Sequence, residues 1–476
     1  MELCIIRCFA IIRETTIELS RKKLFFMILG PLLGLAVFWI LELTGQDRAI
    51  CWTAGVTLLC AIWWIFEPIP IPATSLIPIA VFPVSGVLTP AEVGEAYGSP
   101  LVLLLMGGFI LSTAMERSGA HRRVALTMVN LFGGSSSTRL VFGFMAAAAL
   151  LSMWISNTAT TLMLLPVAMA VIEKSEDKQL AIPLLLGIAY ASSVGGIGTP
   201  IGTPPNLVFR EVYFQNTGER ISFLEWMSWG VPVVLIFVPL IAIWLTRKLN
   251  YRGTTLMPET GAWRTDEKRV FIIFSLTALA WVTRTQPLGG WSHLLGFPGA
   301  NDASVALLAV IIMFMIPNGK GERLLDWDHA VQIPWGMLIL FGGGIAIAKA
   351  FVSSGLSESL GQMLTGLSTW HVILMVGVIC ICLTFMTEMT SNTATTTLLL
   401  PILAAAALAA QVDPALLMVP ATMSASCAFM LPVATAPNTI VFSSGQVSIQ
   451  TMVREGFILN LIGVIVITTV CVLLIA

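Results

Sequence analysis

The chain has 476 residues, of which 57% are apolar and only 11% are Asp, Glu, Lys or Arg, and its mean hydropathy is +0.89. Soluble globular proteins carry roughly 25% charged residues, so this composition excludes a soluble protein. The net charge of -1 says nothing about partners, and nucleic-acid binding has no support because no sustained basic, polar domain is present. We therefore expect an all-α polytopic membrane protein in the cytoplasmic membrane, because helices satisfy their own backbone hydrogen bonds in lipid.

Uncharged apolar runs predict the helices that cross about 30 Å of hydrocarbon. Residues 1–23 carry mixed charge and place apolar side chains on one helical face, which predicts an interfacial segment on the cytoplasmic surface. Two stretches, about 139–173 and about 370–410, are too long for one crossing and are broken at their centres by Ser-Asn-Thr, so we interpret each as a re-entrant hairpin. The predicted spans are 24–43, 49–66, 69–88, 98–117, 180–209, 226–246, 268–287, 303–317, 334–355, 414–443 and 451–475.

The distribution of basic residues indicates the orientation in the membrane. With a cytoplasmic N-terminus and two re-entrant hairpins, 20 of the 25 Lys and Arg residues fall inside and four outside, while Lys349 lies within a span. This bias predicts about 11 transmembrane helices plus two re-entrant hairpins, and a C-terminus outside. If the hairpins were full crossings, later loops would change sides, so the basic loop 247–269 checks this topology.

Two long motifs occur twice in the chain. Residues 153–166 (MWISNTATTLMLLP) and 388–401 (EMTSNTATTTLLLP) are identical at nine of fourteen positions. Each copy is followed by a second matching tract, 191–206 and 423–438, that ends in Pro-Asn. The chain therefore reads as two homologous halves, and the predicted topology makes them an inverted repeat. The first repeat is 24–249 with a broken helix at about 180–212; a cytoplasmic loop, 250–267, leads to the second repeat, 268–476, with a broken helix at about 414–443 and a last helix at 451–475.

The duplicated tracts predict a binding site for cations and an anion. Their Pro, Gly, Ser, Asn and Thr residues break helices, and broken backbone at membrane depth survives only inside protein or beside a water-filled cavity. Freed carbonyls, hydroxyls and amide oxygens suit a small cation such as sodium, while restarting helices direct their N-terminal N–H groups at an anion. A single such motif would more simply serve helix packing or back-bonding. Its repetition at near-equal spacing favours binding.

These motifs resemble the divalent anion:sodium symporter family, which carries dicarboxylates, citrate or sulfate. The resemblance runs from about residue 24 to the end of the chain. It implies a homodimer in membrane lipid, in which each subunit has a scaffold part and a transport part that moves as an elevator. The paired Ser-Asn-Thr motifs are typical of the family, and so is the later pattern Ser426, Phe429, Pro432, Val433, Ala434, Asn438, Ile440 and Val441.

The resemblance also implies site residues. The first sodium site would use Ser152, Ser156, Asn157 and the backbone of Gly202, and the second would use Thr387, Thr390, Asn392 and the backbone of Ala434. Where Ala436 stands, many relatives have proline, as this chain has at Pro204, so one wall of the substrate pocket differs. The substrate carboxylates would meet Asn157, Thr158, Thr203, Asn392, Thr393, Thr435 and Ala436.

Neither tract contains Lys or Arg, so a bound dianion needs another source of positive charge, which at least two sodium ions would supply. We therefore expect a sodium-coupled importer of C4-dicarboxylates such as succinate, malate or fumarate. A citrate or sulfate symporter and a sodium-independent dicarboxylate exchanger are alternatives of the same design. A membrane-embedded lipid enzyme is a distant alternative, because no paired acidic DxxD-type cluster lies in the spans. A passive channel is disfavoured by the two matched sites.

Two charged residues lie inside predicted membrane segments. Glu388 precedes the second Ser-Asn-Thr by three residues, where an unpaired carboxylate costs about 2.5 to 3.5 kcal/mol. It either tunes the second cation site or makes a structural hydrogen bond. Lys349 is expected to snorkel or to pair with an acidic neighbour. Most of the eight cysteines fall in apolar segments and are interpreted as buried small hydrophobes.

Overall fold

A computed structural model of the chain describes residues 2–132, 136–249, 261–286, 289–363 and 371–475. In these ranges the regular structure is helical, apart from an isolated antiparallel bridge between Pro317 and Arg323. The chain divides into two compact units, Met1–Gly98 with Trp335–Met363, and Ser99–Pro334 with Leu364–Ala476. Each unit therefore combines parts of both predicted repeats. The predicted loop at 250–267 lies mostly outside the described residues.

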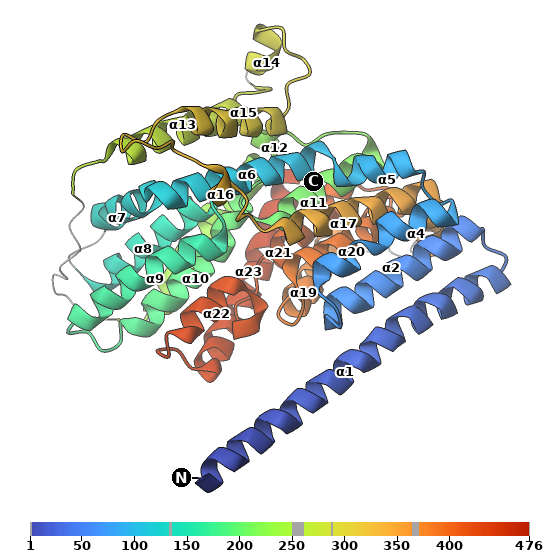
Figure 1. Cartoon of the computed structure of the whole chain (residues 1–476), viewed down its shortest axis with the longest axis horizontal. Coiled ribbons are helices and arrows are strands. Elements are labelled where there is room, and N and C mark those ends of the chain that lie inside the picture. The colour runs from blue at the N-terminus through green and yellow to red at the C-terminus, as the bar shows by residue number, and fades with distance from the viewer. Residues whose placement is uncertain (1, 133–135, 250–260, 287–288, 364–370, 476) are drawn as a thin grey trace. The chain divides into compact units, whose positions relative to one another are not determined.

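The first unit begins with one unbroken helix. Helix α1 covers Glu2–Leu43, so the predicted surface segment 1–23 and the first predicted span continue into each other without a break at residue 23. Helix α2 (Arg48–Phe66) lies alongside α1 (Figure 1). The two backbones approach closely at Gly34, where an added Cβ would lie 2.8 Å from the carbonyl oxygen of Gly55. Small residues allow such contact between apolar helices.

The predicted span 69–88 is replaced by two short helices, α3 (Ile71–Thr74) and α4 (Ile77–Ser85). Prolines explain the difference, because Pro72 and Pro78 each occupy the first turn of a helix, where a missing N–H is tolerated. The unit is completed by α5 (Pro90–Tyr97), α17 (Trp335–Ser353) and α18 (Leu356–Met363). Lys349 of α17 pairs with Glu95 of α5 at 3.0 Å, which confirms the expected acidic neighbour.

The second unit contains both duplicated motifs. In each half, two helices form a hairpin, and a broken helix follows it in the chain (Figure 1). The first half contributes α6 (Pro100–Ser118), α7 (Ala120–Phe132), α8 (Ser137–Ser152), α9 (Asn157–Lys174), α10 (Ala181–Gly195), η1 (Gly196–Gly198), α11 (Pro204–Thr217) and α12 (Phe223–Thr246). The remainder comprises α13 (Thr265–Val282), α14 (Gly290–Leu294), α15 (Asp302–Met315), α16 (Trp327–Ala330), α19 (Val372–Met386), α20 (Asn392–Ala409), α21 (Pro414–Ala425), η3 (Pro432–Ala434), α22 (Ala436–Ser443) and α23 (Ile449–Ile475).

The lengths of these helices agree with a polytopic membrane protein. Among the described residues, eight helical segments are long and apolar enough to cross a membrane. Five shorter apolar helical segments of 10–17 residues accompany them, including α8 and α19, the first limbs of the two hairpins. The second limb of the second hairpin, α20, is one of the eight longer segments, so the re-entrant hairpins stay a prediction. The helices confirm the all-α membrane fold expected from the composition.

Candidate functional site

The first hairpin turns at the Ser-Asn-Thr motif. Helix α8 ends at Ser152 and α9 begins at Asn157. Ser156 caps α9, because its hydroxyl accepts a hydrogen bond of 3.2 Å from the N–H of Ala159. The hydroxyl of Ser152 donates a hydrogen bond of 2.6 Å to Oδ1 of Asn157, which places two oxygens side by side at the start of α9.

The first broken helix passes beside this turn. Asn206 holds the break, because its Nδ2 donates to the carbonyls of Gly196 at 2.9 Å and Thr199 at 2.7 Å. An added Cβ on Gly196 would lie 2.7 Å from Oδ1 of Asn157 and 3.1 Å from the carbonyl oxygen of Gly202. Both oxygens therefore border one small space that only a glycine leaves open. We refer to this space as the first cradle.

The second hairpin repeats this geometry. Helix α19 ends at Met386 and α20 begins at Asn392. The hydroxyl of Thr387 donates a hydrogen bond of 2.6 Å to Oδ1 of Asn392, as Ser152 does to Asn157. It also lies 3.0 Å from the carbonyl oxygen of Ala425 at the end of α21. Three oxygens thus meet at the second hairpin, and the broken helix again contributes one of them.

The second broken helix is held by the matching asparagine. Nδ2 of Asn438 donates to the carbonyls of Ala428 and Leu431, each at 3.0 Å, at the same separations along the chain as in the first half. The amide oxygens of Asn206 and Asn438 are buried without a hydrogen-bond partner in the described structure. Since each amide nitrogen meets two carbonyls, the amide cannot be turned over to satisfy that oxygen.

The two halves interlock at these breaks. Helix α9 of the first hairpin packs against α22 of the second half, and α20 of the second hairpin packs against α11 of the first half. Each of these four helices starts at a break, and α22 is capped by Thr435, whose hydroxyl accepts from the N–H of Asn438 at 3.3 Å. Helix N-termini present free N–H groups and partial positive charge, which favour an anion.

The structure brings some predicted residues together and engages others elsewhere. Ser152, Asn157 and Gly202 share the first cradle, and Thr387 meets Asn392. The hydroxyl of Thr390 instead donates to the carbonyl of Met386 and contacts Thr395, so no described contact links it to Asn392. The hydroxyls of Thr158, Thr203 and Thr393 make no hydrogen bond within the described ranges and remain available to a ligand.

The sequence reasoning missed several contributors. Gly196 forms a wall of the first cradle, whereas the repeat alone marks it only as part of a matched tract. Thr161 bonds both the carbonyl of Asn157 at 2.9 Å and the hydroxyl of Ser192 at 3.1 Å, tying α9 to α10. The carbonyl of Ala425 was also not expected. Ser192 matches Ser424 in the repeat alignment, and that identity was the available signal.

The oxygens at both hairpins fit a sodium ion. Each set combines a hydroxyl, an amide oxygen and a freed carbonyl, which are hard neutral ligands without nitrogen or sulfur. Unwound backbone of this kind coordinates sodium in transporters built from broken helices. Across the described residues, no group of three or more His, Cys, Asp or Glu side chains is placed to hold a metal ion.

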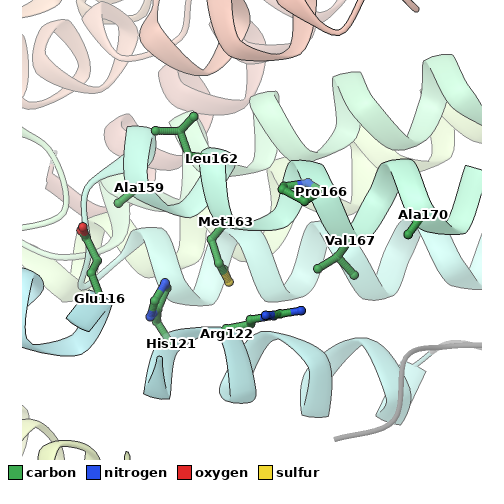
Figure 2. Close-up of a pocket in the computed structure, with 9 residues that line it drawn as sticks. All are labelled: Glu116, His121, Arg122, Ala159, Leu162, Met163, Pro166, Val167 and Ala170. Atoms are coloured by element: carbon green, nitrogen blue, oxygen red, sulfur yellow. The ribbon is translucent and has the colours of Figure 1, made fainter. Parts of the chain in front are cut away.

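A cavity of about 490 Å³ runs along the first hairpin. Met163, Pro166 and Val167 of α9 form its apolar side, and His121 and Arg122 of α7 lie opposite (Figure 2). It reaches Ala159, two residues after Asn157, but none of the predicted site residues lines it. The cavity therefore borders the hairpin and is distinct from the cradles.

The first cradle, the matching oxygens at the second hairpin and the four helix N-termini are features expected of a binding site for small ions in a membrane transporter. The chain belongs to the citrate transporter family, whose model matches residues 61–419. The sodium-dependent dicarboxylate transporter SdcS of Staphylococcus aureus strain NCTC 8325 / PS 47 is 42% identical over 477 residues, covering 95% of this chain and 91% of the relative. The same transporter from strain COL matches equally. The predicted membership of the divalent anion:sodium symporters is confirmed, and this family and these relatives are transporters rather than enzymes.

Solved structures share the fold at low sequence identity. The YdaH transporter of Alcanivorax borkumensis has a TM-score of 0.57 and 16% identity, covering 80% of this chain and 86% of that chain. MtrF of Neisseria gonorrhoeae has a TM-score of 0.55 and 13% identity, with 83% of each chain covered. At this identity the likeness concerns the fold alone, and both neighbours are transport proteins.

Proposed function

We propose that this protein is a sodium-coupled symporter of C4-dicarboxylates such as succinate, malate or fumarate across the cytoplasmic membrane. The observation that carries the proposal is the repeated contact between a hydroxyl and an asparagine Oδ1, 2.6 Å in both halves. It gives the chain two similar oxygen sites, each beside a broken helix. The sodium dependence and dicarboxylate substrate named for the 42% identical relative support the same assignment.

Charge balance provides the coupling. The four tracts of the proposed site contain no Lys or Arg, and their one charged residue is the acidic Glu388. Only partial helix charges in these tracts could therefore offset the charge of a dicarboxylate. At least two sodium ions, one beside Asn157 and one beside Asn392, would neutralise the dianion. Sodium binding would also fix the hairpin turns before the substrate arrives. Substrate affinity and sodium affinity should therefore be linked, each raising the other.

The substrate would bind among the helix N-termini. In this proposal its carboxylates meet the side chains that begin α9 and α20, and the hydroxyls that precede α11 and α22. Ala436, the first residue of α22, is exposed and replaces the proline that follows Thr203 in the first half. This smaller residue widens one wall of the site, which favours a substrate longer than sulfate.

The family also suggests how transport proceeds. We propose a homodimer in membrane lipid, with the N-terminus cytoplasmic and the C-terminus outside, in which a transport part moves as an elevator against a scaffold part. The hairpins would be re-entrant, one from each side of the membrane. Support for this architecture comes from the repeated hairpins and the family, and cysteine labelling of each hairpin from either side of the membrane would test the orientation.

Citrate is a second candidate substrate, because the matching family model describes citrate transporters. A sulfate carrier or a sodium-independent exchanger would use the same fold. The two sodium-type oxygen sets favour symport, because an exchanger has no need of two cation sites.

Uptake by purified protein in proteoliposomes distinguishes these functions. We expect labelled succinate to accumulate only with an inward sodium gradient, and unlabelled succinate, malate or fumarate to compete better than citrate or sulfate. Uptake that is indifferent to replacing sodium with potassium would contradict symport. Stronger competition by citrate would establish the second candidate instead.

A further inference from the structure

Glu388 is a buried carboxylate at the turn of the second hairpin. Its side chain is only 3% exposed. Three consecutive backbone N–H groups donate to it: those of Phe429 at 2.7 Å, Met430 at 2.9 Å and Leu431 at 3.0 Å. Nδ2 of Asn460 in α23 donates a fourth hydrogen bond of 2.8 Å. Successive N–H groups of this kind form a concave binding site for an anionic group.

These hydrogen bonds provide partners for backbone N–H groups of the unwound segment between α21 and η3. Its carbonyls are bonded separately, with Asn438 taking those of Ala428 and Leu431 and Tyr190 donating to that of Phe429 at 2.7 Å. Without Glu388, three consecutive N–H groups, one of them buried and two partly buried, would lose the partner that they have here. Unpaired backbone groups away from water are unfavourable, so the carboxylate stabilises the path of this segment.

The first half links its hairpin turn to its broken helix by a different kind of hydrogen bond. In the repeat alignment Glu388 corresponds to Met153, and Leu431 corresponds to Thr199. There the hydroxyl of Thr199 donates to the backbone carbonyl of Met153. Both halves thus fasten the hairpin turn to the broken helix at matching positions, but the second half alone does so with a charged side chain.

The fastened segments lie next to residues that are expected at the second cation site. Thr387, whose hydroxyl meets Asn392, directly precedes Glu388, and Ala434 follows Leu431 by three residues. We infer that Glu388 is a positioning residue for the second sodium site. It holds the chain that leads to the Ala434 carbonyl against the hairpin turn, and it places a negative charge beside a site built otherwise from neutral oxygens. This inference rests on the proposed sodium-coupled function.

The charge makes the two cation sites unequal. A carboxylate in a low-dielectric interior attracts a nearby cation more strongly than it would in water. Four hydrogen bonds hold Glu388 in place, so it acts on the ion through position and field without becoming a ligand. Removing it should weaken sodium binding more than substrate binding at saturating sodium.

The test compares Glu388→Gln and Glu388→Asp with wild type in proteoliposomes. Because a neutral amide removes the charge and accepts hydrogen bonds more weakly than a carboxylate, we expect Glu388→Gln to raise the sodium concentration for half-maximal succinate uptake by about tenfold or more. The maximal rate at saturating sodium and the half-saturating succinate concentration there should change little. Glu388→Asp keeps the charge on a shorter side chain and should recover part of the sodium affinity.

A second readout does not depend on transport. Ligands that bind the folded state raise its melting temperature, so sodium should stabilise purified wild-type protein over potassium, and stabilise Glu388→Gln less at the same concentration. Glu225→Gln is the matched control, because Glu225 accepts the N–H of Ser222 at 3.1 Å in the cap of another helix. That variant should show wild-type sodium dependence in both measurements.

The outcomes separate this inference from the proposed function. If wild type shows no sodium-dependent uptake, the proposed function fails. If wild type does and Glu388→Gln has the same sodium dependence, the role of Glu388 is overturned. Should Glu388→Gln not be recovered as folded protein, Asn460→Ala replaces it, since it removes one of the four hydrogen bonds. An unchanged sodium affinity in that variant would equally overturn the inference.

Discussion

Thr387 and Asn392 are joined by a hydrogen bond of 2.6 Å from the hydroxyl to the amide oxygen. The bond crosses the hairpin turn and keeps both oxygens at the N-terminus of α20. Ser152 and Asn157 make the same hydrogen bond at the same length, so this contact occurs at both hairpin turns.

Replacing Asn157 or Asn392 with alanine should reduce sodium-dependent succinate uptake to background, because each change removes one oxygen of a cation site. The helices themselves should survive, since Ser156 still caps α9. Uptake into proteoliposomes measures the effect, and size-exclusion chromatography checks folding. Asn216→Ala is the control, because its Nδ2 bonds only the carbonyl of Val212 on the same helix. Normal transport by both site variants would show that the site is misassigned.

Gly196→Ala should fill the first cradle. The added Cβ would lie 2.7 Å from Oδ1 of Asn157 and 3.1 Å from the carbonyl oxygen of Gly202, leaving no room for a cation between them. We expect sodium-dependent uptake to be lost or to need far more sodium. Gly108→Ala is the control, because nothing lies within 4 Å of its added Cβ. If the two variants show the same sodium titration, the cradle is not a cation site.

Asn206→Ala and Asn438→Ala should destabilise the two broken helices. Each change removes two hydrogen bonds and leaves the carbonyl of Gly196 or Ala428 without a described donor, at a cost of about 1 to 3 kcal/mol. The carbonyls of Thr199 and Leu431 keep the backbone N–H groups of Gly202 and Ala434. A lower melting temperature of the purified protein is expected for both variants, by similar amounts, because the contacts match. A clear difference between the two would mean that neighbouring contacts compensate one break.

Acid should weaken the contact between α7 and α13. Nε of Arg123 lies 2.8 Å from Glu267, whose side chain is 7% exposed. Burial alone would raise the pKa of Glu267, but the backbone N–H of Arg264 and the Arg123 guanidinium outweigh it and hold the pKa below its usual value. Since the folded state has the lower pKa, this stabilisation is complete above the unfolded-state pKa and is lost as pH falls through the folded one.

We therefore expect the melting temperature of the purified protein to fall as the pH drops below the ordinary pKa of a glutamate, about 4.3. Glu267→Gln should reduce this pH dependence and cost about 3 kcal/mol at neutral pH, because it leaves a buried guanidinium unpaired. Glu322→Gln is the control, because the Glu322 carboxylate, which pairs with Arg117, is 67% exposed. An unchanged acid response in Glu267→Gln would refute this explanation.

The duplicated motifs predicted where helices break. Two copies of Ser-Asn-Thr at matched spacing indicated the turns between α8 and α9 and between α19 and α20, and the structure shows the same hydrogen bond at both turns. Thr390 illustrates the limit, because its hydroxyl bonds Met386 and Thr395, a local choice that composition does not reveal. Glu388 shows another limit. Its partners are backbone groups 41 to 43 residues away, and backbone leaves no signature in sequence.

The boundaries of apolar helices were less predictable than their existence. Hydropathy does not distinguish an interfacial helix from the first turns of a transmembrane helix. Helix α1 continues through residue 23 without a break, so the structure marks no boundary between the two. The same measure treated 69–88 as one span, although its prolines divide it into α3 and α4. In both cases, backbone hydrogen bonding determines where a helix begins and ends, and mean hydropathy does not measure it.

The packing of α9 against α22 and of α11 against α20 has a consequence for synthesis. Helices α9 and α11 emerge from the ribosome long before their partners, because α20 begins at Asn392 and α22 ends at Ser443. The first half is therefore inserted before the helices that pack against α9 and α11, and the polar N-termini of these two helices lack their packing partners until the second half is inserted. Neither half can be a separate folding unit, and two fragments made as separate chains should become stable only when both are present.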